Sequence, residues 1–420
     1  MDIEVERMKK GLAIVAFWCP PPTDQQYRWL QEAGFDSIIL DSKFDQFVGS
    51  KELKCAVQLA GKYGLKAYPC IPWDPWEETT VADLANDYTG EVGFGGYYSD
   101  EPRQRIDIFT KMPSIVKTLE KYPKAEYWVT LASSIGPYFE CNTYEDTVEY
   151  YMENFGKNHR ILSVDYYPLI QKDGVPIVSE RWLECIEIVA QAAKTYRKDL
   201  YCFVSTMSMS SPGLNCRAVG EKDIRYQIYA SLAYGAKGIE YFCYMTPGLP
   251  PFDGEFLAQD KALIWSKDYQ VDDYSTYERT ENWYAAKKIN EELRFLEEEY
   301  MKFTWQGILT VEGKNHSTSA NACIKKAKTS LTEYSRIEAV QSSEDTLIGC
   351  FEDSEGNNAF MLMNFSDPSA NIKDVIKIKF KDAQQVVCIK NGERENRAVI
   401  DGVYEATLQA GEGCFVIIKK

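Results

Sequence analysis

The chain has 420 residues, of which 45% are hydrophobic, so it can bury a large core and exceeds the usual size of one domain. A formal net charge of −16 argues against nucleic acid and anionic membranes as partners, because both bind basic patches. Twelve cysteines without a Cys-x-x-Cys pair and only two histidines argue against a disulfide scaffold, a histidine zinc site and a Ser-His-Asp triad. No apolar stretch reaches the length of a membrane span. We therefore expect a reduced, cytoplasmic protein with a neutral substrate and without a cofactor or metal.

Strand-like and helix-like segments alternate from residue 12 to about residue 300. The predicted strands are Leu12–Trp18, Ser37–Asp41, Lys66–Trp73, Gly93–Asp100, Glu126–Ala132, Ile161–Tyr167, Leu200–Thr206 and Gly238–Tyr244. The predicted helices are Asp24–Ala33, Lys51–Tyr63, Ile106–Lys121, Thr143–Asn154, Ser179–Tyr196, Glu221–Tyr234 and Tyr277–Tyr300. This alternation predicts an α/β protein with a (β/α)8 TIM barrel over residues 1–302. A doubly wound open sheet is the main rival, but no Gly-x-Gly-x-x-Gly follows the first strand.

The pattern changes after about residue 302 to short segments with a period of two. These segments are Gly307–Glu312, Ile337–Gln341, Thr346–Glu352, Ala359–Phe365, Ile376–Phe380, Gln385–Ile389 and Cys414–Ile418. The dipeptides Asn391-Gly392 and Asp401-Gly402 are typical of hairpin turns. We predict a small all-β sandwich over residues 303–420, with a structural buttress, a dimer surface and a carbohydrate-binding unit as its alternative roles. The oligomeric state is left open, and a homo-oligomer is compatible with the sequence.

Acids and aromatic residues gather at the predicted carboxyl ends of the barrel strands, where barrel enzymes hold their chemistry. The candidate substrate-binding residues there are Trp18, Asp41, Trp73, Asp74, Trp76, Tyr98, Tyr166, Tyr167 and Tyr244. Strand alternation directs one of the two adjacent tyrosines to the barrel interior and the other to the helix layer. An aldolase would need a strand-end lysine and a metallohydrolase would need histidines, and these positions carry neither. Paired carboxyl groups cleave a glycosidic bond, and aromatic rings provide flat apolar surfaces for the sugar.

The Asp100-Glu101-Pro102 sequence is the most informative of these strand ends. Pro102 cannot donate a ladder hydrogen bond, so the strand stops there and leaves two carboxyl groups at its end. A carboxylic acid among aromatic residues can have its pKa raised by burial and act as a proton donor. The alternative is that Asp100 only caps the following helix and Glu101 is solvated.

The chain also resembles the glycoside hydrolase (β/α)8-barrel superfamily, in particular relatives of the family 42 β-galactosidases. The resemblance spans most of residues 10–300 and rests on the segments 97–102, 162–168 and 231–242. In the large retaining clan of that superfamily, strand four ends in Asn-Glu-Pro and its Glu is the acid/base, which implies that role for Glu101. That clan places its nucleophile at the end of strand seven, where residues 203–207 contain no acid.

Three alternatives remain for the second carboxyl group. Asp165 ends strand six and is our preferred nucleophile or base. Asp100 itself could assist, as in enzymes that resemble hexosaminidases, and Asp41 or Asp74 could hold a water for inversion. We interpret Glu240 as an interior acid, because it comes early in strand eight.

The sequence therefore predicts a glycosidase, a hydrolase of carbohydrate metabolism, that acts on a small neutral oligosaccharide or glycoside with Glu101 as general acid. A non-catalytic carbohydrate-binding barrel and a transglycosylase that uses the same site are the alternatives.

Overall fold

A computed structural model describes residues 11–40, 51–70, 88, 90–100, 126–132, 141–211, 214–246, 261–266, 276–315, 318–327, 331, 333–334 and 336–419. Within them, eight parallel strands form one sheet in the order β3-β2-β1-β12-β9-β6-β5-β4. Parallel bridges Ala67↔Phe94 and Cys70↔Tyr98 join the two ends of that order, so the sheet closes into a barrel. Its strands are β1 (Ala13–Phe17), β2 (Ser37–Leu40), β3 (Lys66–Pro69), β4 (Gly96–Ser99), β5 (Glu126–Leu131), β6 (Ile161–Val164), β9 (Asp199–Ser205) and β12 (Gly238–Phe242). The predicted TIM barrel is confirmed.

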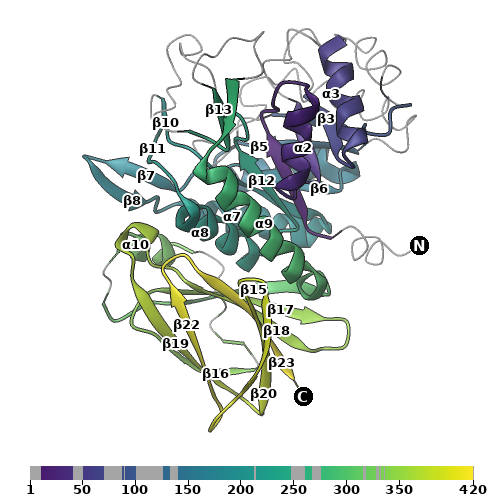
Figure 1. Cartoon of the computed structure of the whole chain (residues 1–420). Coiled ribbons are helices and arrows are strands. Elements are labelled where there is room, and N and C mark those ends of the chain that lie inside the picture. Colours follow the sequence, from purple (N-terminus) through teal and green to yellow (C-terminus); the bar gives the residue numbers. More distant parts are fainter. Residues whose placement is uncertain are drawn as a thin grey trace.

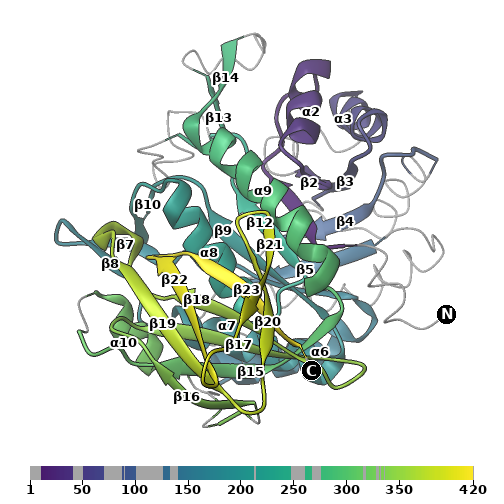
Figure 2. The same ribbon diagram turned by 60° about the horizontal axis from the view of Figure 1, so that its bottom comes forward.

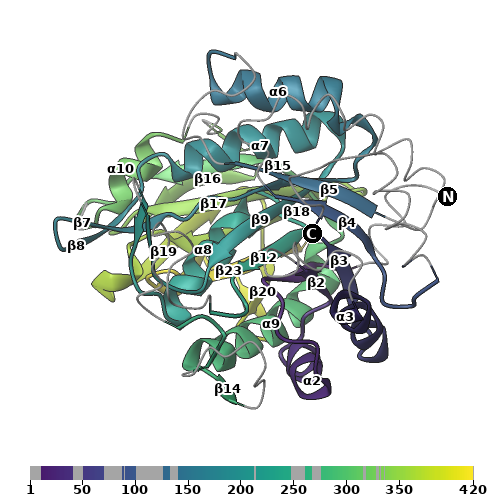
Figure 3. The ribbon, with the colours of Figure 1, turned by 90° about the horizontal axis from the view of Figure 1, so that it is seen from above.

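Helices surround the barrel on its outer side (Figure 3). They are α2 (Asp24–Glu32), α3 (Lys51–Lys62), α6 (Tyr144–Asn154), α7 (Trp182–Tyr196), α8 (Glu221–Ala233) and α9 (Glu281–Tyr300). Threonine side chains cap the first turns of three of them, since Thr23, Thr143 and Thr280 each accept a hydrogen bond from a backbone N–H three residues on. The Thr280 cap also explains why α9 begins later than predicted. The predicted helix over residues 106–121 lies outside the described residues.

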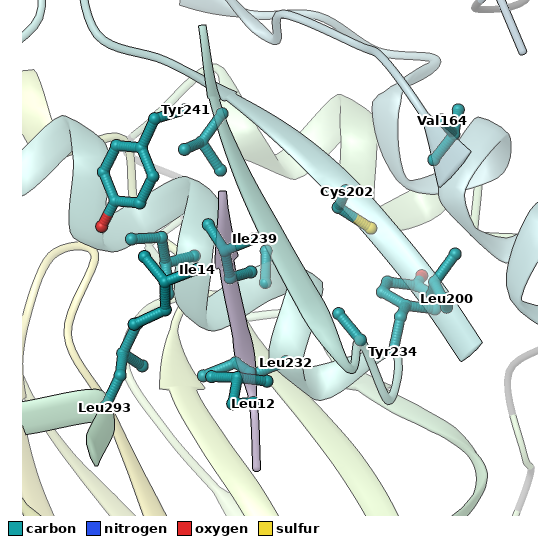
Figure 4. Close-up of a cluster of buried hydrophobic side chains, with 14 of the residues drawn as sticks. Leu12, Ile14, Val164, Leu200, Cys202, Leu232, Tyr234, Ile239, Tyr241 and Leu293 are labelled. Atoms are coloured by element: carbon teal, nitrogen blue, oxygen red, sulfur yellow. The ribbon is translucent and has the colours of Figure 1, made fainter. Parts of the chain in front are cut away.

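Alternate strand residues fill the layer between the barrel and its helices. Ile14 of β1, Ile239 and Tyr241 of β12, and Leu12 just before β1 face outward and pack with Leu293 of α9 (Figure 4). Ile14 and Ile239 lie opposite each other in the parallel register of these two strands. This layer belongs to one continuous cluster of buried side chains, so the helices hold the barrel closed through apolar burial.

Glycines set the close approach of β4 to its neighbours. Gly96 has a φ of 146°, and a Cβ there would lie 1.8 Å from the carbonyl oxygen of Glu126 on β5. A Cβ on Gly93 would lie 2.0 Å from the carbonyl oxygen of Val57 in α3. Only glycine fits between these backbones. The glycine spacing before Asp100 is therefore required by packing.

Shorter antiparallel strands lie in the segments that follow barrel strands β6, β9 and β12. The hairpin of β7 (Leu169–Lys172) and β8 (Val175–Val178) follows β6 and joins β10 (Met209–Ser211) and β11 (Leu214–Cys216) in a four-stranded sheet. After β12, β13 (Ile264–Ser266) pairs with β14 (Tyr277–Arg279). The segment 277–279, which the sequence assigns to the start of a helix, is thus a strand.

The C-terminal part is a β-sandwich, as predicted. One sheet has the order β15-β17-β18-β23-β20-β21 and the other β16-β19-β22, and their facing apolar side chains form a separate cluster. The strands are β15 (Phe303–Val311), β16 (Ile337–Gln341), β17 (Thr346–Asp353), β18 (Asn358–Asn364), β19 (Lys373–Phe380), β20 (Gln385–Lys390), β21 (Glu393–Ala398), β22 (Val403–Gln409) and β23 (Gly413–Lys419), with a short helix α10 (Ala320–Lys325) after β15. Both Asn391-Gly392 and Asp401-Gly402 have positive φ at each residue, as type I′ hairpin turns require.

Two strands of the sandwich are absent from the sequence-based assignment. All six residues of β21 are exposed and four of them are charged, so this edge strand carries no apolar alternation. In β22, by contrast, Tyr404, Ala406 and Leu408 alternate with exposed residues, and this was the signal that could have identified it.

The sandwich packs against the helices α7, α8 and α9 (Figures 1 and 2). A Cβ on Gly349 of β17 would lie 2.1 Å from the carbonyl oxygen of Ala233, so strand and helix backbones meet there directly. The Tyr300 ring at the end of α9 contacts Phe351 and Phe415, with ring centroids 5.4 and 5.5 Å away. These side chains belong to the same cluster as the helix layer of the barrel. The two parts therefore share a hydrophobic core.

No helix in the described part of the chain combines the length and apolar character needed to cross a lipid bilayer.

We expect the Phe365→Ala substitution to test this shared core. Phe365 is fully buried between Trp182 and Tyr226, with ring centroids 6.0 and 5.1 Å away. Its truncation should lower the free energy of unfolding by about 3–5 kcal/mol, through lost burial and the cavity left behind. Urea denaturation followed by tryptophan fluorescence measures this loss. Phe295→Ala on α9 is the matched control, because that ring is 39% exposed, and an equal loss in both variants would contradict the prediction.

Candidate active site

Two carboxylates face the barrel interior at the carboxyl ends of β4 and β6. Tyr98 belongs to the interior cluster, and the next residue of the same strand face is Asp100, whose Oδ1 accepts a hydrogen bond from the Tyr98 hydroxyl at 2.9 Å. On β6, Ile161 and Ser163 point inward, so the alternation places Asp165 on the same side. Asp165 is buried and Asp100 is half-buried. Only β5 separates the two strands, so both acids belong to one sector of the rim.

Aromatic rings line the same end of the barrel. Phe242, at the end of β12, contacts the rings of Phe17, Trp18 and Tyr167, with centroids 5.4, 5.2 and 5.3 Å away. Trp18 has a φ of 60°, which is rare for a bulky residue. This turn interrupts the strand alternation, so Phe17 and the following Trp18 both face the rim. Backbone strain of this kind persists only where the surroundings fix it, and it concentrates at functional sites.

Below the rim, a row of hydroxyl groups crosses the barrel interior. The Tyr98 hydroxyl lies 2.7 Å from Thr130 Oγ1, and Thr130 Oγ1 lies 2.9 Å from Ser163 Oγ. Ser163 is hydrogen-bonded in turn to Glu240, whose other oxygen accepts a hydrogen bond from Trp128 Nε1 at 3.2 Å. All five side chains are at most 1% exposed. Glu240 is thus an interior acid with its hydrogen bonds satisfied, as the sequence predicts.

Burial governs the protonation of Glu240. Removal from water raises its pKa from 4.5 to about 8, while the hydrogen bonds from Ser163 and Trp128 act in the opposite direction. The carboxyl group is therefore largely protonated at neutral pH. A neutral acid in the centre of a barrel avoids the cost of a buried, uncompensated charge.

The opposite end of the barrel holds a charged cluster. Arg160 Nε donates to Glu126 at 2.9 Å, and the same guanidinium pairs with Asp199. The Tyr68 hydroxyl donates to Glu126 at 3.2 Å. These groups satisfy one another, so the cluster stabilises the end of the barrel remote from the candidate site. This agrees with the usual division of barrels into a stabilising end and a reactive end.

The predicted site residues fall into three groups. At or just below the rim, Asp100 is hydrogen-bonded to Tyr98, and the rings of Trp18 and Tyr167 contact Phe242. The alternation of β6 places Asp165 at the rim as well. Five predicted residues lie outside the described residues: the general acid Glu101 and the candidate substrate contacts Asp41, Trp73, Asp74 and Trp76. The remaining two, Tyr166 and Tyr244, are placed elsewhere.

The placement of Tyr166 and Tyr244 corrects the prediction that they contact a substrate. The Tyr166 hydroxyl is 2.6 Å from Ser179 Oγ on the helix side of β6, as the alternation with the inward Tyr167 requires. Tyr244 is fully buried and packs edge-on against Phe35, with ring centroids 5.6 Å apart, between the barrel and its helices. Both are core residues outside the barrel interior.

Sequence reasoning missed several residues of the interior. Phe242, Thr130 and Ser163 line the barrel with the predicted residues, and Phe242 contacts three of the rim rings. The available signal was strand alternation, counted back from the rim acids along their strands and forward from Glu240 along β12.

Among the described residues, no group of three or more His, Cys, Asp or Glu side chains is arranged to hold a metal ion.

The end of the seventh barrel strand carries no carboxylate, as its sequence implies. In that segment, Ser205 Oγ donates to the Met207 carbonyl at 2.8 Å, and Thr206 Oγ1 donates to the Cys243 carbonyl at 2.7 Å. Both hydroxyls serve the local backbone. In the described part of the rim, the candidate acids are therefore Asp100, after the fourth barrel strand, and Asp165, after the sixth.

We expect Glu240→Gln to remove a pH dependence of stability. Between pH 4.5 and about 8 the folded protein retains a proton on Glu240 that the unfolded chain releases. The free energy of unfolding should fall with rising pH by about 1.4 kcal/mol per unit in this window, relative to the variant, and level off above it. Urea denaturation of both proteins across the window measures the difference. A constant difference would show that Glu240 titrates alike in the folded and unfolded states.

Neither a protein-family model nor a curated protein matches the chain. Among solved structures, it is similar to a GH27 β-L-arabinopyranosidase from Geobacillus stearothermophilus, with a TM-score of 0.52, 10% identity and coverage of 99% of this chain and 98% of that one. It is also similar to a β-galactosidase from the psychrophilic Marinomonas ef1, with a TM-score of 0.50, 9% identity and coverage of 72% of this chain. The chain spans 63% of the length of that β-galactosidase. At these identities the similarity shows the fold: this chain has the (β/α)8-barrel fold of these glycosidases.

Proposed function

We propose that this protein is a glycoside hydrolase that cleaves a small neutral oligosaccharide or glycoside by carboxylate acid/base catalysis. The observation that carries this proposal is the rim of the barrel, where strand alternation directs Asp100 and Asp165 inward at the ends of β4 and β6, and where Phe242 contacts the rings of Trp18 and Tyr167. Paired carboxyl groups supply the proton transfers and the carbocation stabilisation that glycosidic cleavage needs. Aromatic rings present flat apolar faces on which the carbon–hydrogen face of a sugar packs.

In the proposed mechanism, Glu101 protonates the leaving oxygen and Asp165 acts as nucleophile or base. The role of Glu101 rests on its place in Asp100-Glu101-Pro102, directly after a rim acid at the end of β4. The burial of Asp165 favours a carboxylate that meets the substrate in a water-poor site. The separation of the two carboxyl groups sets the stereochemistry: about 5–5.5 Å gives retention and about 6.5–9.5 Å gives inversion.

The activities stated in the names of two structural neighbours support this proposal. A β-galactosidase and a β-L-arabinopyranosidase both release neutral sugars, and this chain has their fold. A variant of the Geobacillus enzyme was solved in complex with arabinose, with a TM-score of 0.51 to this chain. A neutral sugar is also consistent with a chain of net charge −16, which would repel an anionic one. The cytoplasmic location and the role of the sandwich as a buttress stay proposals.

One observation favours a second candidate function, a non-catalytic carbohydrate-binding barrel. The described end of β9 has no acid, and its hydroxyls are engaged with backbone carbonyls. A barrel that kept its aromatic rim but lacked a working carboxyl pair would bind sugars without cleaving them. Transglycosylation would use the same residues with a sugar in place of water as acceptor.

We expect wild-type protein to hydrolyse at least one member of a panel of aryl glycosides of neutral sugars in both anomeric forms. Glu101→Gln and Asp165→Asn should each lower kcat at least about 100-fold, because each removes a group that transfers a proton or stabilises charge. Asp173→Asn, in the exposed turn between β7 and β8, is the matched control and should keep full activity.

The leaving group distinguishes the two roles. The loss in Glu101→Gln should be much smaller for an activated nitrophenol than for a poor leaving group, because only the latter needs protonation. The loss in Asp165→Asn should not depend on protonation of the leaving group in this way. Sugar binding by calorimetry without turnover in wild type, unchanged in Glu101→Gln, would instead establish the binding module. Product analysis with an added sugar acceptor identifies transglycosylation.

A further inference from the structure

The row of hydroxyl groups in the barrel connects two carboxyl groups. It runs from Asp100 on the rim through Tyr98, Thr130 and Ser163 to Glu240 in the interior, with successive oxygens at 2.9, 2.7 and 2.9 Å before the final link to Glu240. The five residues come from or directly follow four different strands, β4, β5, β6 and β12. We call this set the hydroxyl chain. Its interior members are fully buried, which shields them from exchange with water.

The number of available protons limits which hydrogen bonds the hydroxyl chain can form. It has four links, and each of its three hydroxyl groups carries one proton to donate. A complete set of hydrogen bonds therefore needs one further proton, on one of the two terminal carboxyl groups. With the proton on Glu240, every hydroxyl points toward the rim and Tyr98 donates to ionised Asp100. With Glu240 ionised, every hydroxyl points inward and Asp100 must itself donate to Tyr98.

We propose that Asp100 and Glu240 share one proton through the hydroxyl chain, so that the buried Glu240 is a positioning residue that sets the protonation state of the rim carboxyl. Reversal of the chain moves the proton without solvent. Glu240 gives its proton to Ser163, Ser163 gives its own to Thr130, Thr130 to Tyr98, and Tyr98 to Asp100. Each hydroxyl ends with one proton, Glu240 becomes a carboxylate, Asp100 becomes neutral, and the total charge is unchanged.

The electrostatics around the chain agree with this arrangement. Burial raises the pKa of Glu240 to about 8, and the pKa of Tyr98 is raised by burial and then by the charges of Asp100 and Glu240. Val15 of β1 and Phe203 of β9 flank Glu240 in register and carry no charge. Among the described residues, the titratable groups nearby include Cys70, which follows β3, Tyr68 of β3, and Tyr201 and Cys202 of β9. Burial raises the pKa of the last three, so they stay neutral while Glu240 titrates.

The catalytic consequence rests on the proposed glycosidase function. A rim acid that can be neutral or ionised beside a reacting sugar can donate or accept a hydrogen bond as charge develops. The hydroxyl chain would let Asp100 switch between these states when a bound substrate excludes water from the rim. The relevant pair of pKa values then belongs to Asp100 and Glu240 together rather than to either one.

The test is a pH titration of the carboxyl carbons in protein labelled with 13C at its Asp and Glu side chains. Asp100→Asn and Glu240→Gln identify the two resonances. In wild type we expect the Asp100 resonance to respond to the same titration step as that of Glu240. Tyr98→Phe and Thr130→Val each remove one hydroxyl with little change in shape and should move the midpoint of Asp100 by about one pH unit or more. Glu240→Gln should also move it.

Thr147→Val is the matched control, because Thr147 is also buried but donates to the Thr143 carbonyl in α6, outside the barrel interior. An Asp100 midpoint that is the same in wild type, Tyr98→Phe, Thr130→Val and Glu240→Gln would overturn the proposal. The two hydroxyl variants are independent, so misfolding of one leaves the other to decide.

This titration needs no substrate, so it succeeds or fails separately from the glycosidase assignment. If a glycoside is turned over, the pH profile of kcat/KM should shift in Thr130→Val together with the Asp100 midpoint. A shifted midpoint with an unchanged profile would overturn the role in catalysis and leave the shared proton established.

Discussion

Closure of eight parallel strands into a barrel is the constraint on which the candidate site depends. Once β3 and β4 are joined, each strand must send alternate side chains to one enclosed interior. Tyr98, Thr130, Ser163 and Glu240 then meet, although they come from four strands far apart in the sequence. The same alternation directs Asp100 and Asp165 to the rim. An open sheet with the same strands would spread these polar groups along one helix-covered face, with β9 between Ser163 and Glu240.

Apolar burial outside the barrel offsets the cost in free energy of placing polar groups in its interior. A barrel interior that holds Glu240 and three hydroxyls gives up apolar contacts that an ordinary barrel core would make. The surrounding helices and the sandwich compensate by burying one continuous apolar cluster, which extends from Ile14 through Tyr300 to Phe415. Placing a polar network inside a strongly packed shell is the usual compromise between stability and function at active sites.

One strained residue and one close backbone contact lie at the candidate site. Trp18 takes a left-handed backbone conformation beside Phe242 at the rim. Gly96 lets β4 approach β5 closely, and Tyr98 of β4 is hydrogen-bonded to Thr130 of β5. The glycines before the rim acids thus position the site by removing bulk from the backbone contacts beneath it.

The sequence by itself determined the eight barrel strands, most of the helices and the sandwich, because strand and helix periodicities are local properties of the chain. It also located Asp100 and Asp165, since acids that end apolar strands stand out without any structure. Only the tertiary structure decided which side chains meet: Phe242 beside Trp18, the hydroxyl chain that ends at Glu240, and the exclusion of Tyr244 from the interior. These depend on the register between strands and on one left-handed residue, and a single one-residue shift of a strand would turn each of its side chains to the other face.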